Sequence, residues 1–134
     1  MKQFAGIFIA ALFLSSAVSA QAEVAVIINP AASTAPTQAE VANIFLGKNK
    51  SFKGVDLKDW SASKDTFYTT VTSKNEAQLK SYWSSLVFTG KGQPLPSVAS
   101  EADVVAKVAA EADAIGYVDS SAVTDQVKVL FTLP

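Results

Sequence analysis

Hydroxyl and acidic side chains gather at one expected helix start, in the stretch "DWSASKDTF" at residues 59–67. A helix N-terminus exposes unpaired N–H groups and carries partial positive charge. Hydroxyls such as those of Ser61, Ser63 and Thr66 can therefore cap the helix or donate hydrogen bonds to a bound anion. One serine suffices for a cap, and three hydroxyls exceed that requirement. Both interpretations, a structural cap and an oxyanion site, stay open on these residues alone.

Enzymatic chemistry finds little support in the composition. The chain contains no histidine and no cysteine, which excludes His-based triads, proton shuttles and thiolate sites. Asp56 and Asp59 lie three positions apart on an expected strand, so their side chains should point to opposite faces. Asp65 is explained by the favourable position of an acid near a helix start. We therefore expect no enzyme, no catalytic residue, no metal and no cofactor.

The basic residues argue against a nucleic-acid partner. All eleven are lysine, and they form no cluster along the chain. Bidentate clamping of phosphate by arginine is excluded, because the chain has no arginine. The stretch "TGKG" at residues 89–92 has only half of a phosphate-loop spacing and is interpreted as a flexible turn.

The N-terminal segment has the marks of a signal peptide. Lys2 is followed by an apolar run over Ala5–Val18 and then by small residues suited to cleavage. The run is too short to span a bilayer. We expect a signal peptide over residues 1–22 and one domain over residues 23–134, exported to the periplasm and not inserted in the membrane after cleavage.

Short apolar runs alternate with amphipathic segments in the expected domain. Such alternation predicts an α/β fold, with one small mixed sheet and helices packed on its faces. Strands are expected over residues 23–29, 55–60, 114–119 and 127–131. Helices are expected after Thr37, near Ser61, after Ser73 and after Ser100.

The third expected helix carries an apolar stripe, which we interpret as core packing rather than an aromatic binding box. Its start is placed by the capping-box spacing of Ser73 and Glu76. Residues 88–97 hold two glycines and two prolines and are expected to form a surface loop. The members of the stripe are Leu79, Tyr82, Trp83, Leu86 and Val87.

Several pieces in order resemble the phosphate substrate-binding proteins of bacterial phosphate ABC transporters, which have the type II periplasmic-binding-protein fold. They are "VAVIINP", "EVANIFLGKNKSF", the Ser/Thr helix start, "YWSSLVFTGKGQP" and "AIGYVD". Within that group, the chain looks more like the short secreted members. The resemblance covers nearly the whole mature chain and implies a single lobe, because full-length relatives have two. It also implies transport as the setting, with a membrane component of the transporter, a second lobe or a second protomer as partner.

The resemblance also implies site residues. Relatives grip phosphate with an Arg-x-Asp-x-Ser-Gly-Thr segment at a helix start, and "LKDWSAS" is similar to it. Asp59 falls on the aspartate, Ser61 on the serine and Ser63 on the threonine. Leu57 takes the place of the arginine and Ala62 that of the glycine, so the strongest phosphate contact of the relatives is missing.

The expected ligand is phosphate or another small oxyanion. Ser61 and Ser63 would donate hydrogen bonds, backed by the N–H groups of Ser63 and Lys64, and Asp59 would accept one from a protonated phosphate oxygen. A few such contacts from one side predict weak binding. The alternative is a secreted interaction module that kept the lobe and lost the ligand, with the hydroxyls acting only as caps.

Overall fold

A computed structural model describes residues 23–134 of the 134-residue chain. The predicted signal peptide at residues 1–22 lies outside these described residues. Within residues 23–134, no helix is both long enough and apolar enough to cross a membrane.

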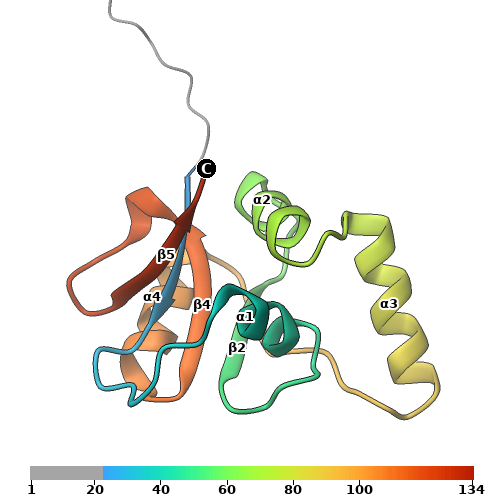
Figure 1. Ribbon diagram of the computed structural model, residues 1–134. Helices are drawn as coiled ribbons and strands as arrows, with labels where there is room; N and C mark the ends of the chain where they lie inside the picture. Colours follow the sequence, from blue (N-terminus) through green and yellow to red (C-terminus); the bar gives the residue numbers. More distant parts are fainter. Residues whose placement is uncertain (1–22) are drawn as a thin grey trace, which may run out of the picture.

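Five strands form one mixed sheet in the order β3-β2-β4-β1-β5 (Figure 1). β2 runs parallel to β3 and β4, whereas β1 runs antiparallel to β4 and β5. The predicted mixed sheet is confirmed, with one additional two-residue strand at its edge. The strands are β1 (Val24–Ile28), β2 (Lys53–Leu57), β3 (Ser97–Val98), β4 (Ala114–Asp119) and β5 (Lys128–Leu133).

Helices cover both faces of this sheet. Gly116 of β4 faces α4, since a Cβ built there would lie 2.5 Å from Val104. The next residue, Tyr117, points to the other face and stacks on Phe67 of α2, with ring centroids 4.2 Å apart. Figure 1 shows α1 and α2 on the side of the sheet away from α4. The helices are α1 (Gln38–Phe45), α2 (Ala62–Val71), α3 (Glu76–Phe88) and α4 (Glu101–Ala110), with a 3-10 turn at Ser120–Ala122.

Three strands differ from the prediction in their bounds, and β1 is one residue shorter than residues 23–29 at each end. β2 spans Lys53–Leu57 rather than residues 55–60, so Asp59 lies in the turn after the strand and not on it. The Lys58 N–H still donates to the Val98 carbonyl at 3.0 Å, and the chain then turns into the cap of α2. β5 begins one residue later than expected and continues to Leu133.

The predicted cap of the third helix is wrong. α3 starts after Asn75, whose side chain forms a capping box with Gln78. Ser73 instead has a φ of 61° in the turn that ends α2, where the Lys74 N–H donates back to the Tyr68 carbonyl. Ser73 therefore belongs to the turn that ends α2 and cannot cap α3. The predicted capping box of Thr37 and Glu40 is confirmed.

The apolar stripe of α3 is not core as predicted. α1 and α2 already cover that face of the sheet, and α3 lies beyond them, apart from the strands (Figure 1). Leu79 alone is buried, while Tyr82, Trp83 and Leu86 are half-buried and Val87 is exposed.

Candidate functional site

The candidate site is the junction where β2 ends and α2 begins. Ser61 is the N-cap of α2, and its hydroxyl oxygen accepts from the Lys64 N–H at 3.2 Å. The cap interpretation is thus correct for Ser61. A hydroxyl that accepts a hydrogen bond still has its own proton to donate. Capping and anion binding by Ser61 are therefore compatible.

Three polar hydrogens at this helix start have no partner within residues 23–134. They belong to the N–H groups of Ala62 and Ser63 and to the hydroxyl of Ser63. Ser63 is only 5% exposed. Buried polar groups are hydrogen-bonded in the great majority of cases, so an orphan hydroxyl in this position needs an explanation. An acceptor from outside the chain would supply one.

The four predicted ligand residues differ in exposure and in hydrogen bonding. They are Asp59, Ser61, Ser63 and Lys64. Asp59 is exposed in the turn before Ser61, with no hydrogen-bond partner within the described range. The Lys64 N–H is occupied by the Ser61 hydroxyl, so it is not available as the second backbone donor. The N–H group of Ala62 has no partner within residues 23–134 and can serve as this donor instead.

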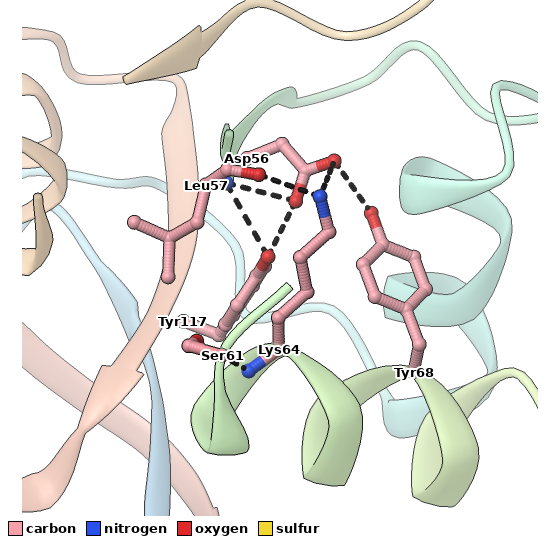
Figure 2. Close-up of polar contacts among 6 residues, drawn as sticks. All are labelled: Asp56, Leu57, Ser61, Lys64, Tyr68 and Tyr117. Carbon is pink, nitrogen blue, oxygen red and sulfur yellow. Dashed lines mark hydrogen bonds and ion pairs between the residues drawn. The ribbon is translucent and has the colours of Figure 1, made fainter. Parts of the chain in front are cut away.

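The Lys64 side chain turns away from the helix start into a buried polar network (Figure 2). Its ammonium donates to the Leu57 carbonyl at 2.6 Å and lies 3.7 Å from the Asp56 carboxylate. Asp56 also accepts from the hydroxyl of Tyr68 at 3.0 Å and from the hydroxyl of Tyr117. The network joins β2, α2 and β4 beneath the candidate site.

Both phenols of the network stay protonated. Burial, followed by the nearby charge of Asp56, raises the pKa of Tyr68 and that of Tyr117 far above the ordinary tyrosine value. Each phenol therefore acts as a donor to Asp56. Because the Leu57 N–H donates to the same carboxylate at 2.9 Å, Asp56 is saturated with donors and is not poised as a general base.

Sequence reasoning missed this network. Asp56 was weighed only as one member of a carboxylate pair with Asp59. The one available signal was Tyr117 in the apolar run "AIGYVD", because a tyrosine in a buried strand needs a partner for its hydroxyl. Nothing in the sequence singles out Tyr68.

Ser61 and Lys64 also have the Ser-x-x-Lys spacing of some nucleophilic serine enzymes. Such chemistry requires the lysine amine to reach the serine hydroxyl. Here the Lys64 ammonium is bonded to Leu57 and paired with Asp56, and the described residues show no bond from it to the Ser61 hydroxyl. The pair is not arranged as nucleophile and base. Within residues 23–134, no three acidic side chains are grouped as metal ligands either.

The fold of this chain is similar to that of several solved proteins. The chain is similar to an ABC-type phosphate transport receptor from Vibrio cholerae, with a TM-score of 0.60 and 16% identity. It is also similar to a protein assigned as a phosphate ABC transporter substrate-binding protein from Clostridium perfringens, solved with phosphate bound, with a TM-score of 0.59 and 22% identity. A third similar structure, assigned as a phosphate-binding protein from Planctomyces limnophilus, has a TM-score of 0.54 and 19% identity. No family model and no curated protein matches the sequence.

The extent of these matches agrees with a single lobe. Each alignment covers 81% of this chain but only 46%, 44% and 41% of the solved proteins, in the same order. The chain thus spans less than half of their length. The resemblance stated from the sequence is confirmed as a likeness of fold to part of these phosphate-transport proteins.

Proposed function

We propose that this protein binds phosphate or another small oxyanion at the N-terminus of α2, as a non-enzymatic binding protein exported to the periplasm. The likeness to phosphate-binding structures supports the class of ligand. The observation that carries the proposal is the buried Ser63 hydroxyl, which has no partner within residues 23–134 and lies beside two unpaired N–H groups.

The bound anion takes four donors from one helix turn. These are the N–H groups of Ala62 and Ser63 and the hydroxyls of Ser61 and Ser63, with the partial positive charge of the helix start behind them. Asp59 accepts from a protonated phosphate oxygen, which disfavours sulfate because sulfate carries no proton near neutral pH. Lys64 contributes by anchoring the helix to β2 rather than by its N–H group.

A one-sided site of this kind is weak. Hydrogen bonds to a charged group contribute about 1.5–3 kcal/mol each, and association entropy opposes them by about 4–15 kcal/mol. The expected affinity is about millimolar, and micromolar capture needs about −8 kcal/mol. A second lobe, a second protomer or a membrane component of an ABC transporter is the proposed partner that closes the open side.

Thermal melting with and without phosphate tests the proposal. Ser61→Ala should destabilise the phosphate-free protein by about 1 kcal/mol, because it removes a cap, and should cost more in phosphate, because it also removes one donor to the anion. Ser63→Ala should leave the phosphate-free protein unchanged or slightly more stable, because it removes a buried hydroxyl with no partner. Phosphate at about ten times its dissociation constant should raise the wild-type melting temperature, and this rise should be lost in Ser63→Ala.

Ser81→Ala is the matched control, since it removes an exposed serine from α3 and leaves the start of α2 unchanged. It should keep the phosphate response. A wild-type melting curve that millimolar phosphate leaves unmoved would overturn the proposal and favour the interaction-module interpretation.

A further inference from the structure

A cavity separate from the proposed oxyanion residues has Lys64 in its lining. It has a volume of about 410 Å³ and lies between α3 and the end of the β2–β3 edge. This volume falls within the usual range for small-molecule sites. The proposed oxyanion residues Asp59, Ser61 and Ser63 do not line it. Both tryptophans of the chain line this cavity. Its apolar lining is completed by Leu57, Leu79, Pro94 and Leu95.

Trp60 is held rigidly against α2. Its ring stacks on Tyr68 with centroids 6.0 Å apart, and its indole N–H donates to the Asp65 carboxylate at 3.2 Å. The Lys64 ammonium lies 5.6 Å from the centre of the same ring. Three contacts from one helix therefore fix the orientation of this wall before any ligand arrives.

Trp83 packs against the turn that follows α1 and against the loop after α3. Gly47, with a φ of +77°, lies so close that a Cβ there would be 2.8 Å from the Trp83 ring. Gly92 packs against the same ring, and the neighbouring Tyr82 donates its hydroxyl to the Leu46 carbonyl at 2.6 Å. Both tryptophans thus already have packing partners within the fold, and each ordered side chain reduces the entropic cost of binding.

The charges around the cavity favour an anion. Three lysines and two acids line it. Lys64 is paired with Asp56 at 3.7 Å, and Lys80 with Glu76 at 3.7 Å. Lys58 has no acidic partner within residues 23–134 and is exposed at the rim, with its backbone tied to Val98. One unpaired cation thus stands beside aromatic and aliphatic surface.

We propose that this cavity is a separate binding site for a small planar aromatic anion, with the ring system against Trp60 and Trp83 and the negative group near Lys58. The cavity offers flat apolar surface for the body of such a ligand and one cation for its head. The inference goes beyond the proposed oxyanion function and does not depend on it.

Titration of the mature protein with 8-anilinonaphthalene-1-sulfonate, an aromatic sulfonate, tests the proposal. We expect saturable binding of one molecule per chain, with energy transfer from the tryptophans to the probe. Lys58→Gln should weaken binding about threefold to fivefold, as expected for an exposed charge contact. Lys128→Gln, on the opposite edge strand β5, is the matched control and should have no effect. N-phenyl-1-naphthylamine, the uncharged counterpart, should bind with no response to Lys58→Gln.

A blocking pair tests the location. Ser84 and Ser85 are neighbouring exposed serines of α3, and only Ser84 lines the cavity. Ser84→Phe should lower the affinity for the sulfonate probe at least tenfold, while Ser85→Phe should leave it unchanged. Ser63→Ala should leave probe binding intact even where it abolishes the phosphate response. Equal probe binding by wild type, Ser84→Phe and Lys58→Gln would overturn the inference.

Discussion

Ser61 and Ser63 lie two positions apart at one helix start, and their hydroxyls are in different states. The Ser61 oxygen already accepts a hydrogen bond from the backbone, whereas the Ser63 hydroxyl is buried without a partner in the described chain. A cap stabilises the fold whether or not a ligand is present. A buried donor without an acceptor contributes only when one arrives. At the residue scale, Ser63 is therefore the more informative of the two serines.

The buried pair of Lys64 and Asp56 should matter far more to stability than an exposed pair. Their side chains are 11% and 15% exposed, against 76% and 47% for Lys80 and Glu76. Lys64→Met leaves a buried carboxylate without its cation and should lower the free energy of unfolding by about 3 kcal/mol. The control Lys80→Met should lower it by less than about 0.5 kcal/mol. Urea denaturation measures both, and similar small losses would contradict the network in Figure 2.

The tyrosines should make the fold sensitive to alkali. Burial is the main cause that raises the pKa of Tyr68, Tyr82 and Tyr117, the three tyrosines of the chain, above 10.0. The folded state then holds these protons where the unfolded state releases them, so their stabilising contribution is full below pH 10.0 and falls as the pH rises above it. Tyrosinate absorbance should appear together with the loss of near-ultraviolet circular dichroism. Tyrosinate formation in a protein that keeps its native spectrum would contradict this.

At the scale of elements, α3 is attached to the rest of the lobe by few contacts. Its Tyr82 hydroxyl bonds to the Leu46 carbonyl, and its Trp83 ring packs on Gly47. Further along, Phe88 is 91% exposed. The helix therefore forms one wall of the tryptophan-lined cavity while contributing little to the core.

Gly47 and Gly90 have similar backbone angles, so comparing their alanine variants distinguishes the cost of displacing Trp83 from the cost of backbone strain. Gly47 has a φ of +77° and Gly90 a φ of +73°, and only at Gly47 would a Cβ meet another side chain. Gly90→Ala should cost about 1 kcal/mol from the left-handed backbone alone. Gly47→Ala should cost about 1–3 kcal/mol more, because it also displaces Trp83. Equal losses in chemical denaturation would show that Trp83 does not pack on Gly47.

Local patterns predicted most of the elements because their causes are local. Thr37 and Glu40 form their capping box within four residues, and the apolar run at residues 114–119 is a strand with the bounds expected. The cap of α3 was misplaced because Ser73 and Asn75 both begin plausible boxes, and the end of α2 decides between them. The apolar stripe predicted α3 but not its exposure. That exposure arises because α1 and α2 already cover the sheet face.

The candidate site was predictable only in part, because some of its features are local and others depend on packing between elements. The Ser/Thr-rich turn signals a helix start, and Ser61 does cap it. Whether Ser63 is buried, and which acid supports the site, depends on contacts between distant segments. Asp56 and Tyr117 are 61 positions apart and meet only because β2 and β4 are neighbours in the sheet.

At the scale of the whole molecule, the chain corresponds to less than half of the solved proteins that share its fold. In the proposed site, an anion at the start of α2 would take all its protein contacts from one helix turn of this chain. Weak binding by the lone lobe, strengthened by a partner that covers the open side, is the behaviour that this arrangement favours.

Backbone amide shifts during a phosphate titration of the mature chain test the central claim most directly. The N–H groups of Ala62 and Ser63 have no partner within residues 23–134 and are the proposed ligands. Their resonances should show the largest shifts, saturating at millimolar phosphate, and sulfate should shift them less. Unmoved Ala62 and Ser63 amides at saturating phosphate, or larger shifts elsewhere in the chain, would contradict oxyanion binding at the start of α2.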